Sequence, residues 1–279
     1  MATTSRLMAA GPGWRVNDFI CTSGPHDRAF AEQYDAACIA AVIEGTFQCR
    51  STRGAAMLVP GAVLLGNEGE CFECGHEHGS GDRCISFHFA SDFFEAIVAA
   101  VPGVRRMSFP VPCLPPLPKL MPLFAAAEAA RDDGDAATLF EEVALRLAGA
   151  VFSVLSAGGS AAPVASPRDE RRITRALRRI EAAAEEKLTL AELAREAAMS
   201  PYHFLRTFHG LVGLTPHQFL LRTRLHRAAV RLRRSPEPVS AVAFDAGFND
   251  LSTFNRRFRR VMGMSPSGYR AQAAATGSP

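Results

Sequence analysis

The stretch that decides the fold of the C-terminal part runs from Val239 to Arg270 and reads VSAVAFDAGFNDLSTFNRRFRRVMGMSPSGYR. Its first residues fit a short helix that ends at Gly247, and Asn249 and Asp250 offer N-caps for a second helix. Apolar side chains recur along the second helix at steps of three and four residues, which predicts a buried face. That face consists of Leu251, Phe254, Phe258, Val261 and Met262, and the opposite face carries Ser252, Asn255, Arg256, Arg259 and Arg260. A short helix, a tight turn and a basic helix predict a helix-turn-helix, whose second helix enters the major groove of DNA.

The end of this stretch extends the pattern. Gly263 ends the helix, and Ser265-Pro266 opens another, with Ser as N-cap and Pro at the first helical position. The whole string, A-x-x-x-G-F-N-D-x-S-x-F-x-R-x-F-R-R-x-x-G-x-S-P-x-x-Y-R, resembles the signature of the AraC/XylS family of bacterial transcription regulators. The resemblance implies a C-terminal, all-α DNA-binding domain with two helix-turn-helix units.

The residues themselves predict a second unit upstream. Thr189 and Glu192 form a capping-box pattern, and Ser200-Pro201 opens the following helix. Before the turn, an offset of 49 aligns Ala194, Ala197 and Met199 with Ala243, Ala246 and Phe248. After it, an offset of 50 aligns Phe204, Phe208, Gly213, Thr215, Pro216 and Phe219 with Phe254, Phe258, Gly263, Ser265, Pro266 and Tyr269. We therefore expect units at about 189–211 and 238–262, with one added residue in the second turn.

A single helix from Thr215 to Arg234 is expected between the two units. About 20 residues at 1.5 Å per residue give roughly 30 Å. One turn of B-DNA is about 34 Å, so the two units could read successive major grooves. Polar positions near the start of each recognition helix are the candidates for DNA contact. We expect that set to be Ser200, Tyr202, His203, Leu205, Arg206, Leu251, Ser252, Asn255, Arg256 and Arg259. For Arg206 and Arg256, base contact and phosphate contact both stay open.

The charge distribution separates the chain into two regions. The net charge of +3 combines −7 over residues 1–167 with +10 over residues 168–279. A basic C-terminal region next to an acidic N-terminal region favours a polyanion-binding module joined to a part with another role. Hydrophobic residues make up 48% of the chain, but no run of eighteen apolar residues occurs, so we expect no membrane span and a cytoplasmic protein.

The N-terminal region is expected to be β-rich, because short apolar runs alternate with Gly and Pro turns up to about residue 115. Arg83 to Phe89 alternates polar and apolar side chains, which predicts a strand with one wetter face. Two Ala- and Leu-rich stretches, 117–131 and 135–155, then predict a helical hairpin, which serves either dimerisation or closure of a barrel. The family resemblance implies a cupin-like β-barrel or jelly roll here. The expected fold class is α+β in two domains, with residues 1–157 as sensor and dimerisation domain, 158–167 as flexible linker and 168–279 as DNA-binding domain.

A cluster of Cys and His side chains marks the N-terminal region. Cys71, Cys74, His76, His78 and Cys84 lie close together in the sequence and are ligand types that zinc and other transition metals prefer. His76-Glu77-His78 resembles the H-x-H of metal-binding cupins, but the Glu and later His usual in those sites are not matched. Three interpretations stay open for the cluster: a metal site, a thiol redox sensor, or a loop and strand without special chemistry.

These observations favour a one-component transcription regulator. The N-terminal domain would bind an unknown small-molecule effector and control double-stranded DNA binding by the C-terminal domain, as a homodimer, with RNA polymerase as partner if the protein is an activator. Such a protein is not an enzyme. The alternative is a cupin-type metalloenzyme, or a metal or redox sensor, fused to a DNA-binding module.

Overall fold

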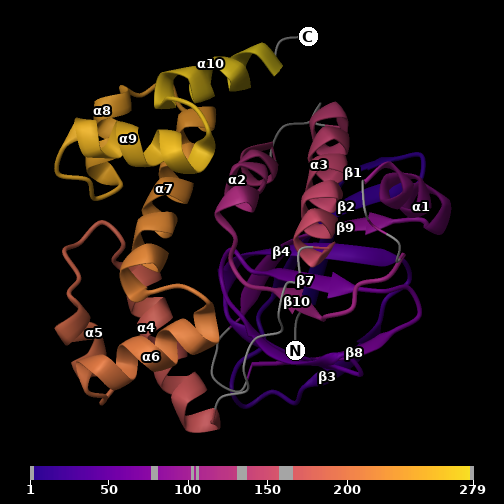
Figure 1. The fold of residues 1–279 in the computed structure, drawn as a ribbon, viewed down its shortest axis with the longest axis horizontal. Helices are drawn as coiled ribbons and strands as arrows, with labels where there is room; N and C mark the ends of the chain where they lie inside the picture. Colours follow the sequence, from indigo (N-terminus) through magenta and orange to yellow (C-terminus); the bar gives the residue numbers. More distant parts are fainter. Residues whose placement is uncertain are drawn as a thin grey trace.

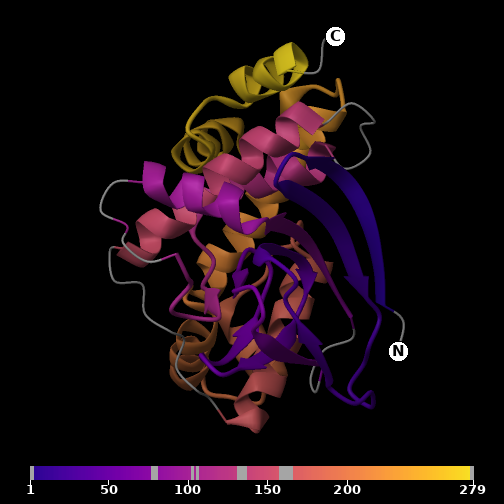
Figure 2. The ribbon, with the colours of Figure 1, turned by 90° about the vertical axis from the view of Figure 1, so that its right-hand side faces the viewer.

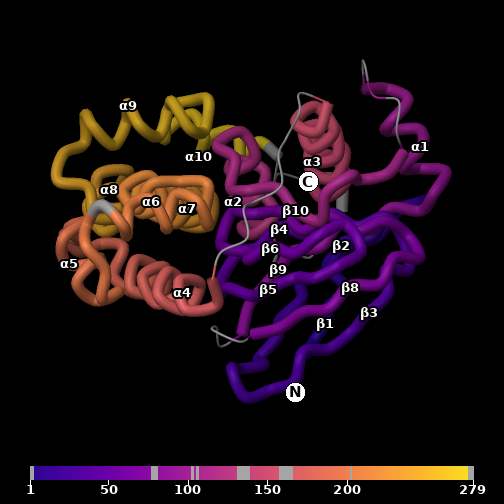
Figure 3. The backbone as a smooth tube through the Cα atoms, turned by 60° about the horizontal axis from the view of Figure 1, so that its bottom comes forward, coloured from indigo at the N-terminus to yellow at the C-terminus, as the bar shows by residue number. Residues whose placement is uncertain are grey.

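The computed structural model of the chain describes residues 3–76, 81–101, 104, 107–130, 137–156 and 166–276. These residues form a β-rich N-terminal part, residues 3–156, and a helical C-terminal part, residues 166–276. The C-terminal part lies along one side of the N-terminal part (Figures 1 and 3). Among the described helices, none is long and apolar enough to cross a membrane.

The N-terminal part is built on two antiparallel sheets. The six-stranded sheet has the order β1 (Thr3–Gly11), β2 (Trp14–Cys21), β9 (Asp82–Phe89), β4 (Ala37–Gly45), β7 (Val63–Gly66) and β10 (Cys113–Leu114). The four-stranded sheet has the order β3 (Phe30–Gln33), β8 (Cys71–Gly75), β5 (Phe47–Ser51) and β6 (Gly54–Leu58). Figure 2 shows β1 and β2 as a long curved pair along one edge. The predicted β-rich region is therefore confirmed, and its likeness to a cupin barrel stays a prediction.

Strand β9 shows why the two faces of the larger sheet differ. Ile85, Phe87 and Phe89 are fully buried and belong to a hydrophobic cluster with the helices of the N-terminal part. Because side chains alternate along a strand, Cys84, Ser86 and His88 point the other way and line a cavity of about 280 Å³. The sequence pattern predicted this division into a dry and a wetter face.

Three helices cover the larger sheet. They are α1 (Ser91–Ala100), α2 (Met121–Ala129), which follows a 3₁₀ turn η1 (Pro118–Leu120), and α3 (Ala137–Ser156). The aromatic rings of Phe94, Phe109 and Phe152 pack together at the centre of the cluster beneath them. The predicted hairpin corresponds to α2 and α3, and residues 131–136 between them lie outside the described residues. The sequence analysis did not predict α1, β1, β2 or β3.

Seven helices make up the C-terminal part: α4 (Pro167–Ala182), α5 (Leu190–Glu196), α6 (Pro201–Val212), α7 (Pro216–Arg234), α8 (Val239–Asp245), α9 (Leu251–Met262) and α10 (Pro266–Thr276). Of the predicted linker 158–167, residues 158–165 lie outside the described residues. Its last two residues are not linker, because Ser166 caps α4 and Pro167 is the first residue of that helix.

The internal repeat predicted from the sequence is confirmed. Helix α8 begins and ends 49 residues after α5, and α9 begins and ends 50 residues after α6. Both recognition helices end at a glycine in the left-handed region, Gly213 with φ 73° and Gly263 with φ 84°, where glycine has no steric penalty. Helix α7 lies between the two units, with α5 and α6 at one end and α8 and α9 at the other (Figure 1).

The two parts of the chain pack directly on each other. Helix α2 contacts α7, and Met121 and Ala125 of α2 join the hydrophobic cluster of the second unit, which includes Leu225 and Phe254. The two helices are also joined by a hydrogen bond at one edge, where Nε2 of His226 lies 2.5 Å from the Glu128 carboxylate. The helical hairpin thus contacts the helix between the two units as well as the sheet.

Candidate nucleic-acid interface

The first helix-turn-helix consists of α5 and α6. A complete capping box starts α5, where Thr189 Oγ1 accepts from the backbone of Glu192 and the Glu192 carboxylate accepts from the backbone of Thr189. Helix α6 begins at Pro201, and Ser200 Oγ accepts from the backbone N–H of His203. Because these caps fix where each helix starts, they also fix which face of α6 turns outward.

The side chains of α6 divide as the sequence predicted. Phe204 and Phe208 are fully buried and pack on each other. Arg206 is exposed, and His203 and Leu205 are half-buried. Tyr202 lies in α6, but its side chain is outside the part that the structure describes. The first unit therefore presents a polar edge that centres on Arg206, near the N-terminus of its recognition helix.

The second unit consists of α8 and α9 and has a clearer division. Phe254, Phe258 and Met262 are buried on one side of α9. Leu251 is 36% exposed, and so belongs to the outer face rather than to the predicted buried stripe. The other predicted outer residues are also exposed; they are Ser252, Asn255, Arg256, Arg259 and Arg260. The face thus combines hydrogen-bonding side chains with cations, the groups that contact base edges and phosphates.

Asp250 fixes the start of α9. Its Oδ1 accepts from the backbone N–H of Thr253 at 2.7 Å, and this bond and the Thr253 side chain hold the pKa of the Asp250 carboxyl below its usual value. The aspartate therefore stays charged at neutral pH and keeps the first turn of α9 in place.

Helix α7 sets the distance between the two units. Its 19 residues give a length of about 28 Å. Arg224, near its middle, donates to the backbone carbonyls of Ala184 at 2.5 Å, Glu186 at 2.7 Å and Gly247 at 2.7 Å. One guanidinium thus joins the turn after α4 to the turn of the second unit. No local sequence pattern indicates this role of Arg224, because its three acceptors are backbone atoms from distant segments.

The predicted metal ligands do not form one cluster among the residues that the structure describes. Cys71 is exposed, Cys74 and Cys84 are buried, and His78 lies outside the described residues. Among the described side chains, those that bring ligand atoms together around His76 are Cys21 and Asp82. Cys74 instead contacts Cys49 on the neighbouring strand.

A second cavity, of about 480 Å³, lies where the two parts meet. Residues of β4, the 60–61 turn and α2 line it from the N-terminal part, and residues of α4 and α7 line it from the C-terminal part. Arg222 of α7 is one of them, and its buried Nη1 has no hydrogen-bond partner among the described residues. Burial lowers the pKa of Arg222 to about 10, so this guanidinium stays charged at neutral pH.

The geometry defines the C-terminal part as a double helix-turn-helix domain of the DNA-binding class. Comparison with known proteins agrees, since residues 193–272 match the helix-turn-helix domain family. The chain is 39% identical over 90 residues to the probable transcriptional regulator LumQ of Photobacterium leiognathi, over 32% of this chain and 36% of that protein. It is 38% identical over 82 residues to a Streptomyces antibioticus protein whose name calls it AraC-like, over 29% of this chain and 27% of that protein.

A solved structure also matches this region. It is the DNA-binding domain of the transcriptional factor AdpA in complex with a target DNA, 31% identical, covering 38% of this chain and 95% of that chain with a TM-score of 0.37. The chain spans about a third of the length of the curated relatives above. Residues 193–272 thus form a helix-turn-helix domain similar to those of AraC-like regulators.

Proposed function

We propose that this chain is a sequence-specific DNA-binding regulator of transcription, in which the N-terminal part responds to a small-molecule effector. The observation that carries the proposal is the repeat itself. Two helix-turn-helix units, each with an outward polar face, stand at the two ends of a helix of 19 residues. A basic surface without such repeated faces would bind DNA of any sequence, because phosphate contacts carry no sequence information.

The predicted contact residues take different roles in this proposal. Asn255 and Arg256 on α9 and Arg206 on α6 have side chains that can form paired hydrogen bonds to base edges. Ser200 and the N-termini of the two recognition helices suit phosphates, because helix N-termini attract anions. The other predicted contact residues flank these positions in the sequence; they are Tyr202, His203, Leu205, Leu251, Ser252 and Arg259.

The test compares arginines of equal charge at different places. The bound operator is first selected from random duplexes with the full-length protein, and affinity is then measured for wild type, Arg206→Ala, Arg256→Ala and Arg175→Ala. Arg175 is an exposed arginine on α4, so its loss controls for net charge. A base-reading arginine should cost about 1–3 kcal/mol and relax the preference at one position. Equal losses on operator and random DNA for all three variants would contradict sequence reading.

The effector site in this proposal is the cavity between the two parts. A ligand there would contact α2 on one side and α4 and α7 on the other, so its binding free energy would depend on how the parts are packed. Such a difference is what an effector needs in order to change DNA binding. The unpartnered Nη1 of Arg222 suits an effector that carries an oxyanion together with apolar groups for Met121, Phe124 and Phe219.

Arg222 gives this part of the proposal its own test. In a thermal-shift screen of small carboxylates and phosphates, hits should stabilise wild type and Arg175→Ala, but not Arg222→Ala. Hits that stabilise all three equally would place the effector elsewhere.

A homodimer, contact with RNA polymerase for activation and a cytoplasmic location complete the proposed function. Because the relatives are transcription regulators, we favour regulation over the alternative of a fused metalloenzyme.

A further inference from the structure

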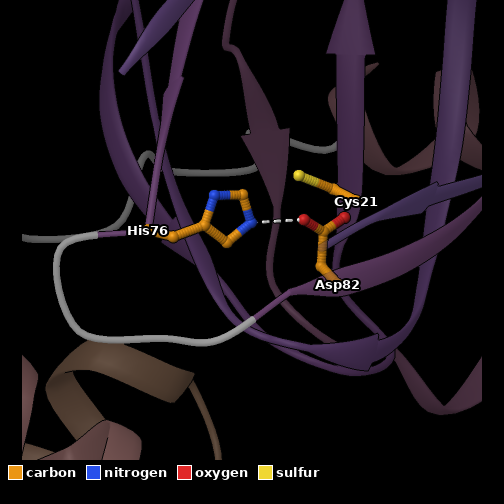
Figure 4. A group of neighbouring side chains, drawn as sticks. All are labelled: Cys21, His76 and Asp82. Carbon is orange, nitrogen blue, oxygen red and sulfur yellow. Dashed lines mark hydrogen bonds and ion pairs between the residues drawn. The ribbon is translucent and has the colours of Figure 1, made fainter. Parts of the chain in front are cut away.

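Three side chains with different ligand atoms meet at one end of the β-rich part. Cys21 ends β2, Asp82 begins β9, and His76 directly follows β8. Their ligand atoms all lie within 4.8 Å of one another, and Figure 4 shows His76 and Cys21 converging on the Asp82 carboxylate. Nε2 of His76 lies 2.6 Å from Oδ1 of Asp82. The cluster joins the two sheets, because β2 and β9 belong to the larger and β8 to the smaller.

Burial makes this arrangement unusual. Cys21, His76 and Asp82 are 2%, 3% and 8% exposed. Buried groups of this kind are normally satisfied by hydrogen bonds or by coordination to a metal. Nδ1 of His76 is buried without a hydrogen-bond partner among the described residues. The same holds for the hydroxyl oxygens of Ser23, two residues after Cys21, and of Thr46, which follows the register partner of Asp82, Gly45.

Two glycines hold the cluster in place. Gly81 has φ +73°, and its backbone N–H donates to the Ser23 carbonyl at 2.7 Å. A Cβ on Gly81 would lie 2.6 Å from the Cys21 carbonyl oxygen, and a Cβ on Gly45 would lie 2.2 Å from the Gly81 carbonyl oxygen. The absence of side chains at these positions therefore lets the ends of three strands approach closely and fixes Cys21 against Asp82, its partner in the strand register.

The chemistry of the three ligands points to one class of cation. A thiolate, an imidazole and a carboxylate together suit zinc, which accepts sulfur, nitrogen and oxygen, and they do not suit magnesium or calcium, which prefer oxygen. Tetrahedral zinc separates its ligand atoms by about 3.3–3.6 Å. The distance between Nε2 of His76 and Oδ1 of Asp82, 2.6 Å, would therefore lengthen by about 0.7 Å when an ion enters. The cavity between the sheets, lined by Cys21 and Asp82, leaves space for water as a fourth ligand.

We propose that Cys21, His76 and Asp82 form a zinc-binding site that joins the two sheets of the N-terminal part. Binding replaces the hydrogen bond between His76 and Asp82 with metal–ligand bonds. The proton that Nε2 of His76 shares with Asp82 moves to Nδ1 of the same ring, and the thiol proton of Cys21 is released to solvent as its sulfur becomes a ligand. This site differs from the set expected from sequence spacing, and it does not depend on DNA binding by the C-terminal part. The contact between Cys49 and Cys74 joins β5 to β8 and involves none of the three ligands.

The test uses full-length protein, stripped of metal under reducing conditions and titrated with Zn²⁺ against a chromophoric chelator. We expect one zinc per chain, with affinity at least tenfold lower in Cys21→Ser, His76→Gln and Asp82→Asn. Cys71→Ser and Cys113→Ser serve as matched controls and should bind as wild type does. Cobalt substitution adds a specific readout, because the thiolate-to-cobalt absorption band should be present in wild type and lost in Cys21→Ser.

Several outcomes would overturn the site. They are no zinc binding by wild type in the titration, unchanged affinity in the three variants, or loss of binding in Cys71→Ser instead. Asp82→Asn keeps the size of the side chain, and DNA affinity reports whether each variant is folded. A variant that binds its operator normally but has lost zinc binding supports the site. A protein that binds zinc normally but binds no operator would contradict the proposed DNA-binding function and leave the zinc site standing.

Discussion

Glu181 lies in the cavity between the two parts, and its protonation should control how firmly they pack. Burial, followed by the nearby charge of Glu44, raises the pKa of the Glu181 carboxyl from 4.5 to about 7, although Arg227 and Arg178 oppose the shift. Between these two values the folded protein holds a proton that the unfolded chain has lost. The free energy of unfolding therefore falls as the pH rises from about 4.5 to about 7.

Glu181→Gln removes this ionisation while keeping the size of the side chain. The rise of the pKa from 4.5 to about 7 corresponds to about 3 kcal/mol at pH 8, where the wild-type carboxyl is charged in both states. At pH 4.5 the expected gain is well below about 1 kcal/mol, because the folded wild type is already protonated there. For a chain of this size, 3 kcal/mol raises the melting temperature by roughly 6 °C.

The assay is thermal unfolding of wild type and Glu181→Gln across this pH range. Glu185→Gln is the matched control for the loss of a carboxylate that faces Arg227, since Glu185 lies 3.6 Å from that arginine but is exposed. Glu44→Gln should reduce the pH dependence in part, because it removes one cause of the shift. A stabilisation by Glu181→Gln that is equal at pH 4.5 and pH 8 would refute the reasoning.

Two further predictions concern how the helix-turn-helix units are held. Gly247→Ala should destabilise the chain by more than about 2 kcal/mol, because φ of Gly247 is +85° and the new Cβ would lie 2.7 Å from the Glu185 backbone. The control is Ala198→Gly, at the equivalent turn position of the first unit, where φ is 51°. It should change stability by less than about 1 kcal/mol. Equal effects in denaturant unfolding would contradict this. Arg224→Ala should cost about 2–4 kcal/mol and weaken operator binding, and Arg224→Lys should recover little of either; full recovery by Lys would show that charge alone matters.

The C-terminal part could be predicted from sequence because its information is local. Caps such as Thr189 and Asp250 act within four residues, and the periodic Phe positions of α6 and α9 repeat at a fixed offset. A prediction made for one unit therefore applies to the other as well, including the glycine that ends each recognition helix. The one-residue step in the offset also proved to be real, since Ser200 caps α6 directly after its turn, whereas Asn249 precedes the Asp250 cap.

The N-terminal part could be predicted only in outline, since its strands pair with partners distant in the sequence. Strand β9 lies between β2 and β4, and no local pattern states that order. Strands β1 and β3 escaped prediction because most of their side chains are exposed, which removes the alternation that marks a half-buried strand. Helix α1 begins two residues after the end of β9, and Ala90 at its N-cap position gives no side-chain hydrogen bond that would mark the start of a helix.

The cluster at His76 shows the same limit at the level of a site. Sequence spacing suggested Cys71 and Cys74 as companions of His76, but residues two or three apart on a strand do not both reach the same point beyond its end. Cys21 is 55 residues away from His76 in the chain and comes into reach only because β2 pairs with β9 and brings Cys21 opposite Asp82. Register therefore decides the ligand set. A substitution that shifts the pairing of β2 with β9 by one residue would turn Cys21 to the opposite face of the sheet and remove the proposed site, although every ligand residue would still be present.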